Sequence, residues 1–125
     1  MRNYNLEETM DSKGNVIVEK SKAFALKIIQ LYKGLVAEKE YVLSRQILKS
    51  GTSIGANVKE AIRGQSKPDF YAKMNIALKE CSETEYWLEL LYESQYINNR
   101  TFRELYSDCK EILRILMAIT KTQNN

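Results

Sequence analysis

The sequence predicts an all-α protein, an antiparallel up-down four-helix bundle. In four separate segments, apolar residues recur at alternating spacings of three and four, the period of an amphipathic helix. No segment alternates with period two for long enough to predict a strand, and the short apolar run Val16–Val18 is the only candidate. The 125 residues include one proline, Pro68, and the segments are separated by short connections, as expected for antiparallel neighbouring helices.

The first helix is expected between Val16 and Val36. The preceding residues 1–15 are polar and are expected to form an extended or disordered tail, so the bundle is predicted to cover residues 16–125. The buried face of this helix is predicted to contain Phe24, Ile28, Leu31 and Leu35.

A second helix is expected between Tyr41 and Arg63, although its middle is unusual. The stretch Ser50–Ala61, SGTSIGANVKEA, concentrates glycine, serine and alanine. A phosphate-binding loop would follow a strand and place a Lys before Ser or Thr, whereas Lys59 precedes Glu60. The apolar period continues through the stretch, so a helix is the better interpretation. On a helical wheel, Leu43, Ile47, Ile54, Val58 and Ala61 fall in one arc, and Ile62 is expected on the same side.

The small residues of this helix predict a close contact. Gly51 and Gly55 each disfavour a helix by about 1 kcal/mol relative to alanine. With Ser53 and Ala56 they make the helix thin, so that another helix of the same bundle or of another subunit can approach closely. Ser53 and Asn57 are expected to satisfy polar groups of a neighbouring helix, with direct ligand contact as the alternative.

The last two helices have clear start signals. Ser66 is a candidate N-cap, with Pro68 in the tolerant first turn and Asp69 at the third helical position. Asn98 or Asn99 is expected to cap the fourth helix. The predicted buried faces contain Phe70, Met74, Ala77, Cys81, Thr84, Leu88 and Leu91, and then Phe102, Leu105, Cys109, Ile112, Leu116 and Ile119.

Composition restricts the classes of function. The net charge of +3 is mildly basic and leaves nucleic-acid binding open. No targeting or membrane segment is apparent, so a cytoplasmic location without a membrane partner is expected. Cys81 and Cys109 are too few and too far apart in the sequence for a zinc knuckle or a disulfide scaffold, and their apolar positions predict core packing.

Enzymatic activity is not expected. The chain has no histidine, which removes Glu-x-x-His di-iron pairs, histidine-activated nucleophiles and the usual zinc sites, and no metal or cofactor is predicted. Among the carboxylates, Glu60, Glu83 and Glu85 stand out. They are expected in interhelical or partner contacts, with a buried carboxylate site as the alternative.

Two basic stripes are the candidate binding surfaces, because helical spacing places four basic residues on one face of each of two helices. A solvated charged face is the ordinary interpretation, and contact with nucleic-acid phosphates is the functional one. The stripes consist of Arg45, Lys49, Lys59 and Arg63 on the second helix and of Arg103, Lys110, Arg114 and Lys121 on the fourth.

A second apolar patch on the third helix predicts self-association. Ile76, Trp87 and Leu90 lie off its core-facing side, and exposed apolar patches often mark interfaces. In the alternative, Trp87 only covers the edge of the bundle.

The segments SIGANVKEAIRGQS and DFYAKMNIALKECSETEYWLELL resemble a bacterial family of four-helix bundles, the 23S rRNA intervening-sequence proteins. That family typically shows S-I-[PG]-A-N-[IV]-x-E-[GA] in the second helix, and [DE]-F and E-x-E-Y in the third. The resemblance extends from about Val16 to the C-terminus. The matching residues are Ser53, Ile54, Gly55, Ala56, Asn57, Val58, Glu60, Ala61, Ser66, Asp69, Phe70, Glu83, Glu85 and Tyr86.

The resemblance implies a ring-like homo-oligomer, commonly a homopentamer, often encoded within large-subunit ribosomal RNA genes. A related protein, the accessory variability determinant of diversity-generating retroelements, assists a reverse transcriptase and binds nucleic acid through a basic surface. RNA, DNA and a reverse transcriptase are thus the implied partners. The chain departs from the family at Val18, where a tryptophan is common, and at Lys79–Glu80, where a Gly-Ser pair is common.

The leading hypothesis is therefore a non-enzymatic, oligomeric bundle that associates with ribosomal or retroelement nucleic acid through its basic stripes. The alternative is a structural or protein-interaction scaffold with no nucleic-acid partner. Salt-dependent binding to RNA distinguishes the two, because phosphate contacts weaken steeply with salt.

Overall fold

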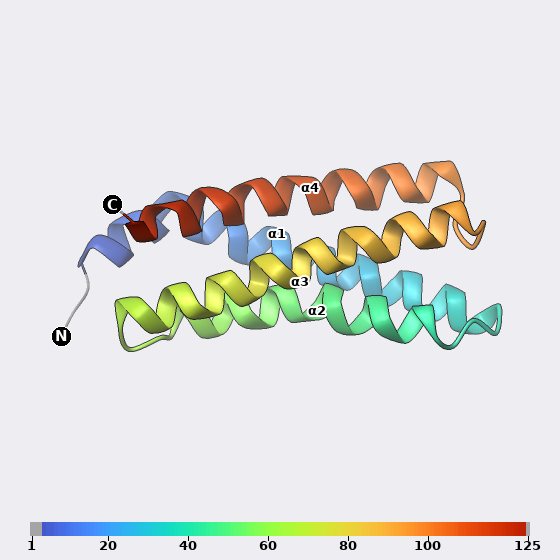
Figure 1. Cartoon of the computed structure of the whole chain (residues 1–125), viewed down its shortest axis with the longest axis horizontal. Helices are drawn as coiled ribbons and strands as arrows, with labels where there is room; N and C mark the ends of the chain where they lie inside the picture. The colour runs from blue at the N-terminus through green and yellow to red at the C-terminus, as the bar shows by residue number, and fades with distance from the viewer. Residues whose placement is uncertain (1–3, 125) are drawn as a thin grey trace.

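The computed structural model describes residues 4–124, with side chains from Val16 to Gln123, and has four helices joined by short turns (Figure 1). Each helix runs antiparallel to the one before it, and no strand occurs in the described part of the chain. Helices α1 and α3 each pack against both α2 and α4. The predicted all-α four-helix architecture is thus confirmed. The helices are α1 (Tyr4–Ala37), α2 (Leu43–Ile62), α3 (Lys67–Glu93) and α4 (Asn99–Lys121), followed by the 3-10 turn η1 (Thr122–Asn124).

Helix α1 begins earlier than the sequence predicted. In place of the extended or disordered tail expected for residues 1–15, the chain is helical from Tyr4 onward, and residues 1–3 lie outside the described residues. The segment contains good helix formers, including Leu6 and Glu7, and no proline. Extending an existing helix adds one backbone hydrogen bond per residue without a new nucleation cost, which favours this continuation.

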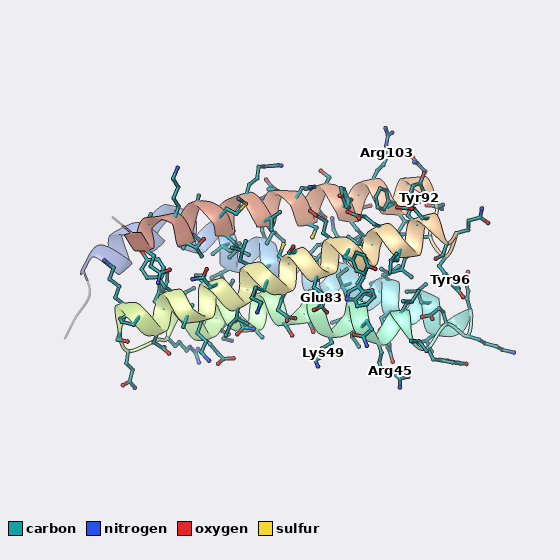
Figure 2. The ribbon with its side chains drawn as sticks, viewed as in Figure 1. Arg45, Lys49, Glu83, Tyr92, Tyr96 and Arg103 are labelled. Carbon is teal, nitrogen blue, oxygen red and sulfur yellow. The ribbon has the colours of Figure 1, made fainter. Side chains whose placement is uncertain are left out.

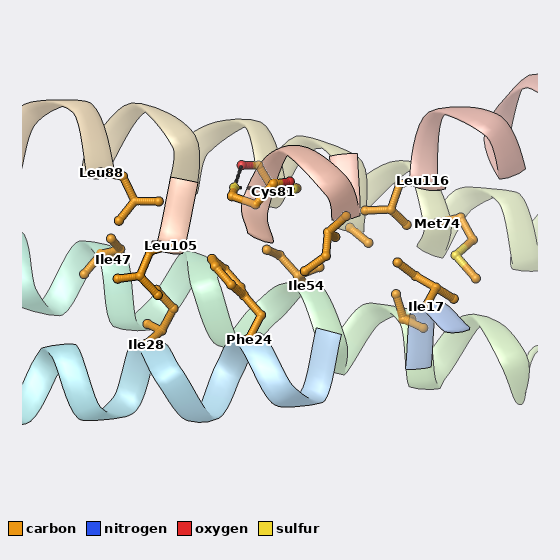
Figure 3. Close-up of a cluster of buried hydrophobic side chains, with 14 of the residues drawn as sticks. Ile17, Phe24, Ile28, Ile47, Ile54, Met74, Cys81, Leu88, Leu105 and Leu116 are labelled. Atoms are coloured by element: carbon orange, nitrogen blue, oxygen red, sulfur yellow. Dashed lines mark hydrogen bonds between the residues drawn. The ribbon is translucent and has the colours of Figure 1, made fainter. Parts of the chain in front are cut away.

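The core runs along the axis of the bundle. Charged side chains such as Arg45 and Arg103 project away from it (Figure 2), whereas aliphatic side chains and Phe24 fill the interior (Figure 3). All four helices contribute, so none of them could bury its apolar face alone. The largest fully buried side chains are Phe24, Phe70, Ile17, Ile28, Leu35, Ile47, Ile54, Met74, Leu88, Leu91, Ile112 and Leu116.

The predicted buried faces are confirmed except at a few positions near the ends of the helices. Leu31, Leu43 and Phe102 are only half-buried. The prediction is wrong at Ile62, which is 43% exposed, while the neighbouring Ala61 is buried. One residue rotates a helical position by about 100°, so only one of two adjacent residues can face the core.

Side-chain caps fix where the helices begin. The Ser66 hydroxyl oxygen accepts a hydrogen bond from the Asp69 backbone N–H at 3.2 Å. The side-chain amide oxygen of Asn98 accepts one from the Thr101 backbone N–H at 2.8 Å. Both predicted N-caps are therefore confirmed. The residue that caps the start of α2 was not identified from the sequence. There the buried Glu40 carboxylate accepts the N–H groups of residues 42, 43 and 44 at 3.2, 3.1 and 2.6 Å.

The small residues of α2 allow α1 to approach closely. A Cβ atom added to Gly51 would lie 2.9 Å from two side-chain carbons of Ile28. A Cβ atom at Gly55 would lie 3.4 Å from the Ser21 hydroxyl oxygen and 3.5 Å from the Ser21 backbone. The predicted close contact is thus confirmed at Gly51, and its partner is a helix of the same bundle, whereas a Cβ atom at Gly55 would make only an ordinary van der Waals contact.

Candidate nucleic-acid interface

The basic stripe of α2 lies on the side of the helix that points away from the core. Arg45, Lys49, Lys59 and Arg63 are all exposed. Figure 2 shows Arg45 and Lys49 extending from the outer side of α2. The eighteen-residue separation of the outermost two corresponds to about 27 Å along the helix axis. We call these four residues the α2 stripe.

Among the side chains that the structure describes, none forms an ion pair with a residue of the α2 stripe. The lysines of α1 that face α4 differ in this respect. Lys20 lies 3.1 Å from Glu111, and Lys27 lies 2.7 Å from Asp108 and 3.0 Å from Glu104. Hydrogen bonds with Asp108 and Glu104 raise the pKa of Lys27. The α2 stripe therefore leaves more of its positive charge available to an external anion.

Two carboxylates of α3, Glu80 and Glu83, lie beside the α2 stripe at Lys49, toward the Arg45 end of the stripe. Burial, and secondarily the charge of Glu83, raise the pKa of Glu80, while Lys49 acts in the opposite direction. Glu83 itself accepts a hydrogen bond of 3.0 Å from the Trp87 indole nitrogen. The edge of the stripe that faces α3 is consequently less favourable for a phosphate than its outward side.

A surface pocket lies where the α2 stripe reaches the turn between α2 and α3. Its volume is about 630 Å³, and Lys59, Arg63 and Lys73 contribute its positive charge. Glu60 and Asp69 also line it, and Lys73 lies 3.4 Å from Glu60. Two of the three cations thus remain without an ion-pair partner among the described residues.

The second basic stripe lies on the opposite side of the bundle, because α4 is diagonal to α2. Arg103, Arg114 and Lys121 are exposed. Lys110 differs, since its ammonium lies 3.1 Å from Glu85 of α3 and 5.4 Å from the centroid of the Tyr106 ring. This ion pair interrupts the stripe, so α4 presents a weaker candidate surface than α2.

Aromatic side chains gather beside the α4 stripe. The rings of Tyr92, Phe102 and Tyr106 stack in sequence, with centroid distances of 4.3 and 4.8 Å. The Tyr106 hydroxyl donates to Glu89 at 2.8 Å, and this bond, assisted by burial, raises the pKa of Tyr106 to about 12. The rings therefore contact one another across the α3–α4 seam, a contact that helical periodicity alone did not reveal.

The polar motif residues of α2 bond within their own helix. The Ser53 hydroxyl donates to the Lys49 carbonyl at 2.6 Å, and the Asn57 amide donates to the Ser53 carbonyl at 2.8 Å. The expectation that they satisfy a neighbouring helix is therefore wrong for these bonds, because serine and asparagine side chains in a helix can reach the carbonyl four residues earlier. Ala56 is exposed on the same face of α2 as the α2 stripe, so the close approach predicted for it is not seen there.

The three singled-out carboxylates do not come together. Glu60 and Glu85 each pair with a lysine of an adjacent helix, while Glu83 bonds within α3. No group of three acidic or cysteine side chains able to hold a metal ion occurs in the described part of the chain. The interhelical contacts predicted for Glu60 and Glu85 are confirmed, and the described geometry gives no support to a shared carboxylate site.

Exposed apolar side chains include residues of α3 and α1, two helices that lie diagonally across the bundle, as well as Ile62 of α2 and Met117 of α4. On α3, Ile76 is 41% and Tyr86 53% exposed, whereas Trp87 and Leu90 are half-buried and Trp87 packs against the core. On α1, Leu26 is 57% exposed. The sequence indicated the patch on α3 but missed Leu26, although its position out of phase with the buried face of α1 could have identified it.

Comparisons with known proteins place these observations in a family. The family model for the 23S rRNA-intervening sequence protein matches residues 13–118. The chain belongs to this family. It also resembles a crystal structure of a protein of unknown function from the S23 ribosomal protein family of Bacteroides thetaiotaomicron. The two are 53% identical, with a TM-score of 0.85, over 87% of this chain and 98% of that one.

No curated protein matches the chain. The residues matched by the 23S rRNA-intervening sequence family model include the positions of the α2 stripe and both halves of the sequence motif. None of the described helices is long and apolar enough to cross a bilayer.

Proposed function

We propose that this protein is a homo-oligomeric, nucleic-acid-associated bundle that binds phosphates through the α2 stripe. The observation that carries the proposal is the row of four exposed cations that have no ion-pair partner among the described side chains. The stripe is straight and long enough to follow several phosphates of a nucleic-acid strand. The name of the family, which refers to 23S rRNA, supports RNA as the nucleic acid.

The expected binding is weak and has little sequence preference. Phosphate contacts position a protein on nucleic acid without reading the bases, and the α2 stripe contains no aromatic residue on which a base could stack. Assembly of several copies would repeat the stripe around the symmetry axis and strengthen the field of each modest patch. Binding is therefore expected to depend on the assembled state.

Titration of the purified protein with labelled RNA and duplex DNA at several salt concentrations tests the proposal. The affinity should fall with a log–log slope of about −0.7 to −0.9 per phosphate neutralised. The variant Lys59→Glu/Arg63→Glu should lose binding to all sequences alike. The matched variant Arg114→Glu/Lys121→Glu changes the net charge equally on the opposite face and should bind like the parent protein.

The outcomes separate the proposal from its alternative. Equal losses in both charge variants would indicate a non-specific effect of net charge rather than a surface on α2. No binding at about 50 mM salt, where electrostatic association is strong, would support the structural or protein-interaction scaffold instead.

A further inference from the structure

Cys81 of α3 and Cys109 of α4 meet inside the bundle, although 28 positions separate them in the sequence. Their sulfur atoms lie 3.7 Å apart (Figure 3 labels Cys81). Each thiol also lies 3.4 Å from the backbone carbonyl oxygen of the other cysteine. Both side chains are fully buried and reduced. The two sulfurs are thus already in direct contact across the α3–α4 seam.

We propose that Cys81 and Cys109 form a redox-sensitive dithiol, which a peroxide converts into a disulfide between α3 and α4. The sulfur–sulfur bond is about 2.0 Å long, so the two atoms must approach by about 1.7 Å, a distance within the reach of side-chain rotation. The new bond would join the helices far from the turn that connects them. This proposal is independent of nucleic-acid binding.

The chemistry proceeds in two steps with a peroxide as the oxidant. One cysteine thiolate attacks a peroxide oxygen, the O–O bond breaks, and a sulfenic acid and hydroxide form. The second thiol then attacks the sulfenic sulfur, the S–S bond forms and the S–O bond breaks, releasing water. Two thiols are oxidised, hydrogen peroxide is reduced to two molecules of water, and the thiol protons end in that water.

Burial controls the rate of this reaction. The hydrogen bond between the thiols, together with burial, raises the pKa of Cys109, so the reactive thiolate is scarce while the seam is closed. Oxidation therefore proceeds from transiently opened states of the bundle. It is expected to be slow in native buffer and faster in mild denaturant, and the buried product should resist reduction for the same reason.

Intact mass spectrometry of the full chain tests the proposal. The protein is treated with hydrogen peroxide and unfolded in the presence of N-ethylmaleimide. It should lose the mass of two hydrogen atoms, take up no alkylating agent, and yield a peptide in which Cys81 is joined to Cys109. Dithiothreitol added after unfolding should restore two thiols. The yield should not change on dilution, because the bond forms within one chain.

Stability and single-cysteine variants supply the controls. The oxidised chain should melt at a higher temperature than the reduced one, since the cross-link restricts the unfolded chain. Cys81→Ala and Cys109→Ala should each retain one thiol that gains oxygen or is alkylated, without a cross-link in the chain. If the parent protein instead gains oxygen or forms disulfides between chains, the proposal is overturned. This test uses the parent protein alone, so it does not depend on whether the alanine variants fold.

Discussion

Glu40 shows what a single side chain does at the point where two helices join. It follows Lys39, whose φ of 66° turns the chain after α1, and its carboxylate occupies the first turn of α2. The first N–H groups of a helix lack partners within the helix. Glu40 supplies three of the missing acceptors at once, so it stabilises the turn and the start of α2 together.

The pH dependence of stability should report this bond. Burial would raise the pKa of Glu40, but hydrogen bonds from three backbone N–H groups and from the Ser44 side chain outweigh it and hold the pKa below its ordinary value. A lowered pKa stabilises the fold above the unfolded-state pKa, and this contribution is lost as the pH falls through the folded-state value. Glu40→Gln should therefore lower the free energy of unfolding by about 1–3 kcal/mol at neutral pH.

Urea unfolding at about pH 7 and about pH 3 measures this contribution. The difference between the parent protein and Glu40→Gln should shrink in acid, because protonation progressively removes the carboxylate charge of the parent as the pH falls toward the folded-state pKa. A difference that stays constant over this range would show that the charge of Glu40 does not matter. The exposed Glu38→Gln, two residues earlier, serves as the control and should change little.

Among the elements, the contact between α1 and α2 explains the odd composition of α2. Glycine disfavours a helix, yet Gly51 is buried directly under Ile28. The energetic cost of the glycine is offset by the closer packing of two helices. Gly34 of α1 is a useful contrast, because a Cβ atom there would meet nothing within 4 Å.

Three glycine substitutions separate packing from helix propensity. Gly51→Ala should lower the free energy of unfolding by about 1–3 kcal/mol, because the new methyl group overpacks against Ile28. Gly34→Ala should raise it by about 0.5–1 kcal/mol, since only propensity changes. Gly55→Leu should also destabilise, because its side chain must displace Ser21. If urea denaturation shows that Gly51→Ala changes the free energy of unfolding in the same way as Gly34→Ala, the close contact has no energetic role.

At the scale of the whole molecule, the exposed apolar patches suggest how copies of the chain would meet. Leu26 on α1 and Ile76 on α3 lie on helices diagonal to each other, each exposed by about half. Two different patches on opposite sides permit a head-to-tail contact, which closes into a ring when the rotation between subunits allows it. An isologous dimer would instead use one patch twice.

Mixing two variants tests this arrangement. Leu26→Glu blocks one patch and Ile76→Glu blocks the other, so each variant alone should be monomeric at micromolar concentration by light scattering. In an equal mixture, each variant offers the patch that the other lacks, and a dimer that grows no further should form. Monomers in the mixture, or assembly of either variant alone, would contradict the head-to-tail arrangement. Circular dichroism checks that both variants remain helical.

The existence of the four helices, the starts of α3 and α4 and most of the buried faces could be predicted from the sequence. These features depend on short-range effects: the helical period selects the buried face, and a cap such as Ser66 or Asn98 bonds a backbone group three residues away. The unbroken period also identified the glycine-rich stretch of α2 as a helix. The extent of α1 was underestimated, because polar residues before Val16 give no periodic signal.

Only the tertiary structure decided which side chains meet across the seams. The sequence places Cys81 and Cys109 on two apolar faces, but the relative shift and rotation of α3 and α4 bring their sulfurs into contact. The same geometry pairs Lys110 with Glu85 and removes it from the α4 stripe, while the α2 stripe stays free of described partners. Periodicity fixes the rotation of a residue about its own helix axis. It does not fix the neighbouring helix or its register, which depend on how all four apolar faces pack at once.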